Sequence, residues 1–467
     1  MSNHKVIIVG AGLAGSEAAL VLSRLDKTLD IELYEMRPKK TTPVHKTGFA
    51  AELVCSNSFK SMKKNSAAGM LKFELAALSS PTLAIALDNS VSAGQALAVD
   101  REKFAFQVTE ELKNSQNIKI VREEFCDISK HSKNCDALIL AAGPLTSKIL
   151  ADELITLTGC DNLSFYDAAA PIVMEESINK NIVFKQDRYN DESSGDYLNA
   201  PFQKIEYERF MNELLNAECI IKKDFESKDL FQACQPIEEV ARTGIDAPRF
   251  GALKPVGLTD PRTGKRPYAV VQLRSENKDC TSYNLVGFQT NLKFAEQKRV
   301  FRMIPGLENA EFARYGVMHR NTFVDSPKIL DWNLCLKNTN IYIAGQLSGT
   351  EGYTEAIRSG YHAAISVISK LKKTNNPTLS RKSIFGSLIS YSTSSDTKNY
   401  QPMHVNFGII EPLEEKIRNK QQRYLKYANR GKTAIQDYIS ELIDLDILNK
   451  EILFDSKKLL KYLGYEE

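Results

Sequence analysis

Two of the eight cysteines in this 467-residue chain stand in settings that suit chemistry. Cys55 lies in the polar stretch 52–58, and Cys234 lies in the stretch 233–238. A polar loop near Arg, Lys or His stabilises a thiolate, which is a nucleophile and also a proton acceptor. The two residues are therefore candidates for a nucleophile and a general acid/base, or for a redox pair.

The other cysteines have ordinary surroundings, and we expect them to be small buried hydrophobic residues: Cys126, Cys135, Cys160, Cys219, Cys280 and Cys335. No two cysteines have C-x-x-C spacing, so we expect no metal site. The chain enters its first strand almost at once, which leaves no room for a signal peptide. We therefore expect a cytoplasmic protein whose cysteines are free thiols.

The elements that must position this chemistry begin with the first 35 residues, which carry the pattern of a dinucleotide site. Residues 6–9 and 31–34 read as buried strands, with a helix over 16–25 between them. The glycines have G-x-G-x-x-G spacing, which allows a tight turn and brings a helix N-terminus to a pyrophosphate. Glu35 follows at the distance from which a carboxylate reaches ribose hydroxyls. The cofactor-binding candidates here are Gly10, Ala11, Gly12, Leu13, Ala14, Gly15, Glu35 and Arg37.

A second part of the cofactor site is predicted near residue 350. A strand over 137–140 ends in small residues, and a strand at 341–343 leads through a glycine-rich turn into a helix over 354–370. This resembles the return by which FAD-binding domains place a helix N-terminus at the flavin. The alternative is two ordinary βα units of one large sheet. The added candidates are Gly143, Gly345, Gln346, Glu351, Gly352 and Tyr353.

Tyr353 is a candidate to stack on the flavin ring, although an aromatic residue at a helix start has a plain structural explanation too. The segment between the two halves carries strand-like runs at 268–273 and 283–288 and a helix at 206–217. We therefore predict an α/β fold, with a glutathione-reductase-like Rossmann FAD domain interrupted by an α+β insert and followed by a helical region. The expected boundaries are 1–150, 151–327, 328–372 and 373–467.

The composition is that of a soluble globular protein, with 43% hydrophobic and 25% charged residues. The apolar stretches are far shorter than a membrane span, so no membrane association is expected. A net charge of +3 is nearly balanced, so nucleic-acid binding has to be inferred from local clusters rather than from the total.

One such cluster lies in a helix predicted over 413–432, where Tyr424 and Tyr427 stand among seven basic residues. A solvated helix face and a stripe that binds RNA phosphates explain this pattern equally well. The basic residues are Lys416, Arg418, Lys420, Arg423, Lys426, Arg430 and Lys432, of which the first five are the RNA-binding candidates.

Several long motifs resemble those of the folate- and FAD-dependent tRNA (uracil-5-)-methyltransferases, the TrmFO family, which is related to the MnmG/GidA flavoproteins. They include Glu52-Leu-Val-Cys-Ser-Asn-Ser58, Leu253-Lys-Pro-Val-Gly-Leu258, Val286-Gly-Phe-Gln-Thr290 and Tyr315-Gly-Val-Met-His-Arg-Asn-Thr-Phe323. Residues beside Cys234 and in 247–252 depart from the family pattern without removing a candidate catalytic group. These departures do not exclude a branch that methylates ribosomal RNA.

The resemblance implies a reaction that the two cysteines suit. A thiolate adds to carbon 6 of a uracil, and the enolate so formed takes a one-carbon unit from 5,10-methylenetetrahydrofolate. A base removes the carbon-5 proton, and reduced flavin, regenerated by NADPH or NADH, supplies a hydride. We assign Cys234 as the nucleophile and Cys55 as the general acid/base, with the reverse assignment open. The expected acceptor is the T-loop uridine at tRNA position 54, which must be unstacked to react.

Three alternatives remain at this point. The same chemistry can act on a ribosomal RNA uridine, or the chain can be a non-methylating flavin-dependent subunit of an RNA-modification enzyme. A third is an NAD(P)H-dependent flavin reductase in which Cys55 and Cys234 are a redox pair. The oligomeric state is expected to be a monomer or a homodimer.

Overall fold

A five-stranded parallel sheet organises the first part of the chain in the computed structural model. Its order is β16-β7-β1-β2-β6. The strands are β1 (Lys5–Val9), β2 (Asp30–Tyr34), β6 (Ile118–Val121), β7 (Ala137–Leu140) and β16 (Ile341–Ile343). The structure describes residues 4–42, 44–160, 163–188, 195–220, 235–375, 377–397 and 400–465, without the side chains of 163–167, 319 and 320. Cys234 lies outside the described residues.

Two helices that are far apart in the sequence pack together beside this sheet. Helix α1 (Leu13–Leu25) follows β1, and α12 (Tyr353–Leu371) follows β16. They approach closely because Gly360 of α12 has no side chain, since a Cβ there would lie 2.1 Å from the carbonyl oxygen of Ala14. The predicted return of the chain to the sheet near residue 350 is therefore what joins the two halves of this domain.

Further helices and a small sheet complete the domain. The helices are α2 (Ala67–Ala77), α3 (Pro81–Asp88), α4 (Arg101–Asn114), α5 (Ile128–Lys133), α6 (Lys148–Thr158) and α11 (Ser326–Ile329), with the 3-10 helix η4 (Gly345–Ser348). Strands β3 (Ser58–Ser61), β5 (Ala96–Val99) and β4 (Ser90–Val91) form a sheet of order β3-β5-β4. Strand β5 pairs with both β3 and β4, and sequence periodicity does not reveal this pairing.

The insert is a separate α+β body around a six-stranded sheet of order β10-β11-β12-β13-β9-β14. Its strands are β9 (Ile172–Met174), β10 (Phe184–Lys185), β11 (Leu198–Phe202), β12 (Ala269–Ser275), β13 (Ser282–Leu285) and β14 (Phe312–Arg314). Its helices are η1 (Glu175–Ser177), α7 (Lys204–Asn216), α8 (Ile237–Arg242), α9 (Ala247–Phe250) and α10 (Phe294–Phe301). The insert has its own hydrophobic core, which is the mark of an independent domain.

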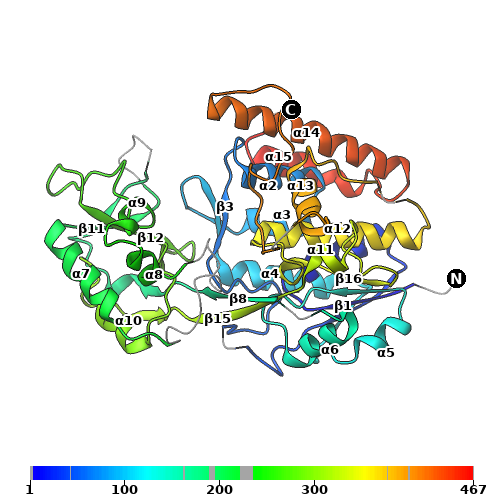
Figure 1. Cartoon of the computed structure of the whole chain (residues 1–467), viewed down its shortest axis with the longest axis horizontal. Helices are drawn as coiled ribbons and strands as arrows, with labels where there is room; N and C mark the ends of the chain where they lie inside the picture. The colour runs from blue at the N-terminus through cyan, green and yellow to red at the C-terminus, as the bar shows by residue number, and fades with distance from the viewer. Residues whose placement is uncertain are drawn as a thin grey trace.

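An antiparallel ribbon of β8 (Leu163–Ala168) and β15 (Met318–Phe323) leads into and out of the insert. Figure 1 shows the insert, in green, to the left of the parallel sheet and connected to it along this ribbon. The expected boundaries after residues 150 and 327 fall inside α6 and α11. The ribbon strands flank the sheet of the insert in the sequence, and this sheet extends from residue 172 to residue 314.

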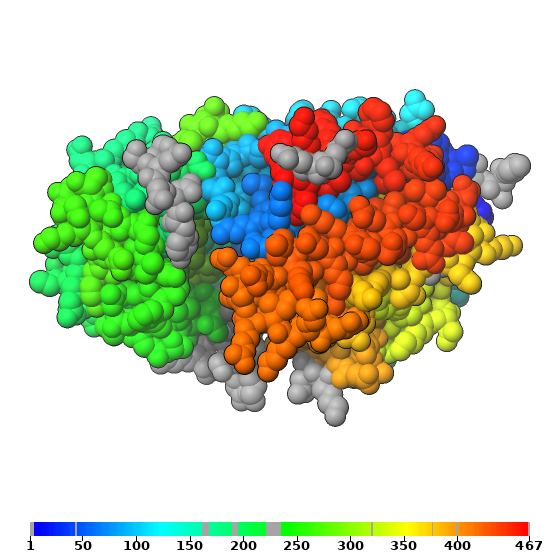
Figure 2. Space-filling model, turned by 90° about the horizontal axis from the view of Figure 1, so that it is seen from above, coloured from blue at the N-terminus to red at the C-terminus, as the bar shows by residue number. Residues whose placement is uncertain are grey.

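The C-terminal region is helical, as predicted, and packs on the outside of the parallel-sheet domain. It consists of α13 (Ile384–Thr393), α14 (Lys420–Asp444), η5 (Ile452–Asp455) and α15 (Ser456–Tyr462). Figure 2 shows it, in orange and red, spread over one face of the molecule beside the green insert. Gly431 lets α14 lie against α2, since a Cβ there would be 2.5 Å from the Met70 methyl carbon.

Helix α14 begins at residue 420 rather than at the predicted 413. The side chain of Asn419 caps the helix by accepting a hydrogen bond from the N–H of Gln422. The preceding residues, 411–417, instead run along the helix and are held by its arginines. Within the described ranges no single helix is long and apolar enough to span a membrane, and α2 and α3 pass such a test only as a pair bent by 113°.

Candidate active site

A pocket opens where β1, β2 and β7 end, and it holds about 1050 Å³ of empty space including its mouth. The position is where open α/β sheets bind their ligands. Of the predicted cofactor-binding residues, the pocket lining includes Gly10, Gly12, Leu13, Ala14, Glu35, Arg37, Gly143, Gln346, Gly352 and Tyr353. The other four candidates, Ala11, Gly15, Gly345 and Glu351, are not part of the lining. Gly10 and Gln346, which are 336 positions apart, thus line one cavity.

The glycines of the fingerprint have the geometry that a dinucleotide requires. Gly10 has φ +96°, and a Cβ there would lie 2.6 Å from the carbonyl oxygen of Ala141. A Cβ on Gly15 would lie 1.9 Å from the carbonyl oxygen of Gly10. Gly12 differs, because its Cβ would meet nothing within 4 Å and would only occupy pocket space. Helix α1 begins there without a side-chain cap, so its first N–H groups can bind a pyrophosphate. The residues fit FAD.

Glu35 is buried at the pocket wall and is already bound on both carboxylate oxygens. Oε1 accepts from the Arg37 N–H and Nε, each at 3.0 Å, and Oε2 accepts from Arg37 Nη2 and the Ala11 N–H, each at 3.1 Å. Burial alone would raise the pKa of Glu35, but the hydrogen bonds and charge of Arg37 outweigh it and hold the pKa below its usual value. A ribose hydroxyl therefore has to share or displace one of these contacts.

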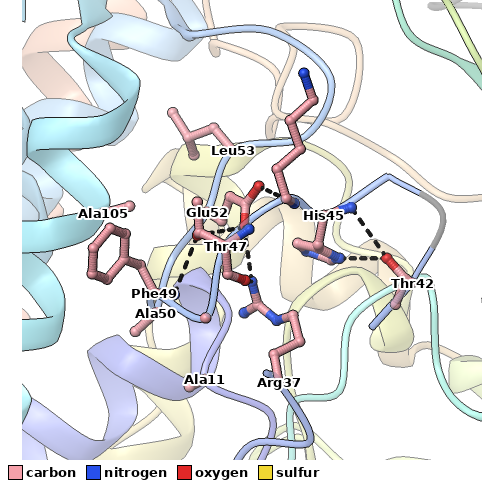
Figure 3. Close-up of polar contacts among 12 residues, drawn as sticks. Ala11, Arg37, Thr42, His45, Thr47, Phe49, Ala50, Glu52, Leu53 and Ala105 are labelled. Atoms are coloured by element: carbon pink, nitrogen blue, oxygen red, sulfur yellow. Dashed lines mark hydrogen bonds and ion pairs between the residues drawn. The ribbon is translucent and has the colours of Figure 1, made fainter. Parts of the chain in front are cut away.

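Glu52 connects Arg37 to the loop that carries Cys55 (Figure 3). Its carboxylate accepts from the Lys46 N–H at 2.8 Å, from the Thr47 N–H at 3.0 Å and hydroxyl at 2.7 Å, and from Arg37 Nη1 at 3.1 Å. Despite burial, these hydrogen bonds lower the pKa of Glu52. The long loop after β2 is thus folded around one carboxylate and is tied by Arg37 to the cofactor pocket.

His45 lines the same pocket, and its Nδ1 lies 2.6 Å from the hydroxyl of Thr42 (Figure 3). Burial, reinforced by the positive charge of Arg37, lowers the pKa of His45 to about 4. The imidazole is therefore neutral near pH 7 and contributes no charge to the site.

Cys55 is half-buried, and its backbone is held beside the pocket by Tyr353. The Tyr353 hydroxyl accepts from the N–H groups of Cys55 and Ser56, each at 3.1 Å, and donates to the Ser56 carbonyl at 3.0 Å. The Cys55 Sγ lies 3.9 Å from the carbonyl oxygen of Ala168. Burial raises the pKa of Tyr353, which therefore stays a neutral phenol. Stacking of its ring on the flavin remains a prediction.

The return segment is shaped by glycines and by one side-chain pair. Gly352, with φ +114°, begins α12 without a side-chain cap, so the helix N-terminus is open toward the pocket. Gln346 Nε2 donates to both carboxylate oxygens of Glu351, at 2.9 and 2.7 Å. The Glu351 N–H donates to the Met403 carbonyl at 2.9 Å, which ties the C-terminal region to the turn.

Asn57 joins the FAD domain to the insert next to Cys55. Its Nδ2 donates to the carbonyls of Val99 and Ser275, each at 3.0 Å, and its Oδ1 accepts from Arg274 Nε at 2.9 Å. Val99 belongs to the FAD domain, whereas Ser275 and Arg274 belong to β12 of the insert. The Cys55 loop therefore lies at the boundary of the two domains.

Among the described residues, the basic cluster divides into members that bind groups of the same chain and members that form no ion pair. Arg423 Nη1 donates to the Ile417 carbonyl at 3.1 Å, and Lys426 pairs with Glu415 at 2.8 Å. Both hold the 411–417 segment against α14. Lys416, Arg418 and Lys420 are exposed, at the end of α14 that lies toward the insert (Figure 1). RNA binding by the five candidates remains a prediction, and the three without such hydrogen-bond or ion-pair partners are the more accessible ones.

Sequence reasoning missed Arg101 and Arg314, whose charges reach Cys55 and Tyr353. Arg101 opens α4, and Arg314 ends β14 of the insert. Neither has a spacing that indicates a site. The one available cue was that Arg314 directly precedes the Tyr315 motif.

Comparison with known proteins gives a consistent result. A family model described as "Glucose inhibited division protein A" matches residues 5–375. The chain is 51% identical over 428 residues to methylenetetrahydrofolate–tRNA-(uracil-5-)-methyltransferase TrmFO of Fusobacterium nucleatum, covering 91% of this chain and 97% of that one. It is 48% identical over 435 residues to the protein of the same name from Acetivibrio thermocellus, covering 93% and 98%.

Among solved structures, Aquifex aeolicus GidA superposes with a TM-score of 0.69 at 15% identity, covering 98% of this chain and 75% of that one. At this identity the likeness concerns the fold, and it confirms the predicted fold class. The resemblance seen in the motifs is confirmed along most of the chain. The chain belongs to the TrmFO family of folate- and FAD-dependent tRNA (uracil-5-)-methyltransferases, within the GidA flavoproteins, and is an FAD-dependent enzyme.

Proposed function

We propose that this protein methylates carbon 5 of the T-loop uridine at tRNA position 54, with 5,10-methylenetetrahydrofolate as one-carbon donor and NADPH or NADH as the source of electrons. The observation that carries the proposal is the position of Cys55, which Tyr353 holds at the edge of the pocket whose residues fit FAD. A thiol there can exchange a proton with a uracil ring that enters from the side of the insert.

The residues of this chain have separate tasks in the proposed reaction. The backbone at Gly12 and the start of α1 bind the pyrophosphate, and the start of α12 faces the flavin end of the pocket. FAD bound there and reduced by NADPH or NADH would supply the hydride that completes the methyl group. Cys55 Sγ removes the proton from carbon 5, because the tyrosine and the loop fix its backbone close to the pocket.

Cys234 is assigned as the thiolate that adds to carbon 6 and is eliminated at the end. Its motif lies outside the described residues, so this role rests on its setting in the sequence and on the family. The exposed Lys416, Arg418 and Lys420 are assigned to RNA phosphates, because they are basic residues at or just before the start of α14, the end of this helix that lies toward the insert (Figure 1). We also propose a cytoplasmic location and a monomer or homodimer.

Product analysis tests the proposal. The purified holoenzyme is incubated with 5,10-methylenetetrahydrofolate, NADPH and an unmodified tRNA transcript, and nucleosides are analysed by mass spectrometry. We expect 5-methyluridine at position 54 and none in a transcript with cytidine there. If only ribosomal RNA is methylated, the acceptor is ribosomal RNA and not tRNA. If the flavin turns over and no 5-methyluridine forms, the proposed methyl transfer is wrong.

The cysteine roles need a separate experiment. An RNA that carries 5-fluorouridine at position 54 should form a covalent adduct, because the fluorine blocks removal of the carbon-5 substituent. We expect the adduct in Cys55→Ala and not in Cys234→Ala. The opposite pattern would reverse the assignment.

A further inference from the structure

Two guanidinium groups, one from each domain, meet at the two peptide groups that precede Cys55. Arg101 Nη1 of the FAD domain donates to the Leu53 carbonyl. Arg314 Nη2 of the insert donates to the Val54 carbonyl. With the Tyr353 hydroxyl on the following N–H groups, both sides of Cys55 are held, and Arg314 is the contact that the insert provides.

The two arginines differ in how their charges are balanced. Arg101 forms an ion pair with Glu276, through Nε at 2.9 Å and Nη2 at 2.8 Å. Burial opposes its charge, but Glu276, Tyr353 and Cys55 together raise the pKa of Arg101. Arg314 has no ion pair with any carboxylate in the described part of the chain. Burial and repulsion from Arg101 lower its pKa, while Tyr353 and Cys55 act in the opposite direction.

The remaining groups around Cys55 leave an excess of positive charge. Lys46 lies close by, with Nζ 3.5 Å from the Ala313 carbonyl. Burial, then Arg314 and Arg101, lower the pKa of Lys46. Glu52 is engaged by Arg37 and the Lys46–Thr47 backbone, and Tyr353 is neutral. Glu276 acts on Arg314 as well as on Arg101, and Glu52 and Glu102 act on Lys46, but burial and the neighbouring arginines outweigh these carboxylates and keep both pKa values low.

We propose that Arg314 is a positioning residue that supplies the counter-charge for the Cys55 thiolate, a role that rests on the proposed acid/base function of Cys55. A guanidinium taken out of water without an anion is costly, and an anion beside it recovers that cost. The thiolate is that anion. In the reaction it takes the proton from carbon 5 of the uracil adduct that already carries the carbon-6 thioether and the one-carbon unit, forming the S–H bond as the C–H electron pair becomes the π bond of the carbon-4 enolate. Because Arg314 comes from the insert, its contribution to the stability of the thiolate requires the insert to be docked on the FAD domain.

The test measures ionisation of Cys55 without RNA or folate. The full-length holoenzyme is alkylated with iodoacetamide across pH 5 to 10, and modification of the Cys55 peptide is followed by mass spectrometry. Arg314→Gln should move the midpoint upward by about one pH unit and slow alkylation near pH 7 about tenfold, as expected for loss of one close opposite charge. Arg314→Lys should restore most of the shift.

The matched control is Arg299→Gln, which removes the same charge from an insert arginine that pairs with Glu213 and Glu296 at the surface. It should leave the midpoint unchanged. Glu276→Gln should shift the midpoint of Cys55 alkylation in the opposite direction, to lower pH, because it removes the negative charge that balances Arg101. This variant also decides the question if Arg314→Gln loses FAD or fails to fold.

Unchanged midpoints in Arg314→Gln with FAD bound, or in Glu276→Gln, would overturn the proposal. Because the experiment uses no RNA, its outcome stands whether or not the protein forms 5-methyluridine. If the midpoint shifts and the protein forms no methylated product, Arg314 does supply the counter-charge but the proposed function is wrong.

Discussion

The phenol oxygen of Tyr353 lies 3.1 Å from the backbone nitrogen of Cys55, across 298 positions of the chain. The same oxygen binds both the N–H and the carbonyl of Ser56. Because Tyr353 is also the first residue of α12, its hydroxyl fixes the Cys55 loop relative to the start of this helix. A change of the hydroxyl alone therefore tests positioning separately from ring packing.

We expect Tyr353→Phe to retain FAD, because the phenyl ring still fills the same part of the pocket. We expect kcat to fall about tenfold, because the N–H groups of Cys55 and Ser56 lose the hydroxyl that accepts their hydrogen bonds. Flavin content and steady-state kinetics measure the two effects. Tyr361→Phe is the control, since that hydroxyl on the same helix donates only to the Leu78 carbonyl at 2.9 Å and does not line the pocket. Equal losses of kcat in both variants would contradict the positioning role.

Gly12→Ala and Gly15→Ala should fail in different ways. A Cβ at position 12 has free space around it and enters the pocket, so the fold should survive while FAD affinity falls at least about tenfold. A Cβ at position 15 would meet the Gly10 carbonyl at 1.9 Å, so Tm should fall even without cofactor. Differential scanning fluorimetry and flavin titration separate the two outcomes, with Gly244→Ala, whose Cβ meets nothing within 4 Å, as the neutral control.

The fully buried His362 should make the protein less stable in mild acid. Burial, with a smaller contribution from Arg358, lowers the pKa of His362 to about 4, while its Nε2 lies 2.9 Å from the Trp332 carbonyl. A depressed folded pKa gives stability that is complete above the unfolded value near 6.5 and is lost as the pH falls toward 4. Between pH 7 and pH 5 this amounts to about 2 kcal/mol.

The measurement is chemical denaturation at pH 7 and pH 5. His362→Gln should be less stable at pH 7 but should lose less stability on acidification than the unmodified protein. The same loss in both proteins would show that other groups govern the acid response.

Charge reversal at the start of α14 should weaken RNA binding. Each of Lys416→Glu, Arg418→Glu and Lys420→Glu should reduce tRNA affinity and lower the slope of log K against log salt by about one unit. Arg423→Glu and Lys426→Glu should act mainly on stability, because they break contacts to Ile417 and Glu415.

The control is Lys27→Glu. Lys27 is exposed and lies between α1 and β2, at the end of the parallel sheet opposite to the pocket. Binding isotherms at several salt concentrations decide the matter. If the first three variants bind tRNA with unaltered affinity and slope, this surface does not contact RNA.

Local patterns in the sequence determined the cofactor domain. The spacing of Gly10, Gly12 and Gly15 between two apolar runs predicted β1, α1 and β2, and the turn before Tyr353 predicted the return to the same sheet. These features are local because a tight turn, a strand period and a helix period depend on neighbouring residues alone. The motifs beyond them were long enough to predict the family, which the relatives confirm.

Only the tertiary structure decided what surrounds Cys55. The hydroxyl of Tyr353 and the guanidinium of Arg314 reach it from positions 298 and 259 residues away, and no periodicity relates such residues. The same holds for β5, which pairs with the distant β3, and for Arg423, whose guanidinium donates to the Ile417 carbonyl. Hydrogen bonds and charge pairs act through space, so the sequence determined which groups exist, and the fold determined which of them meet.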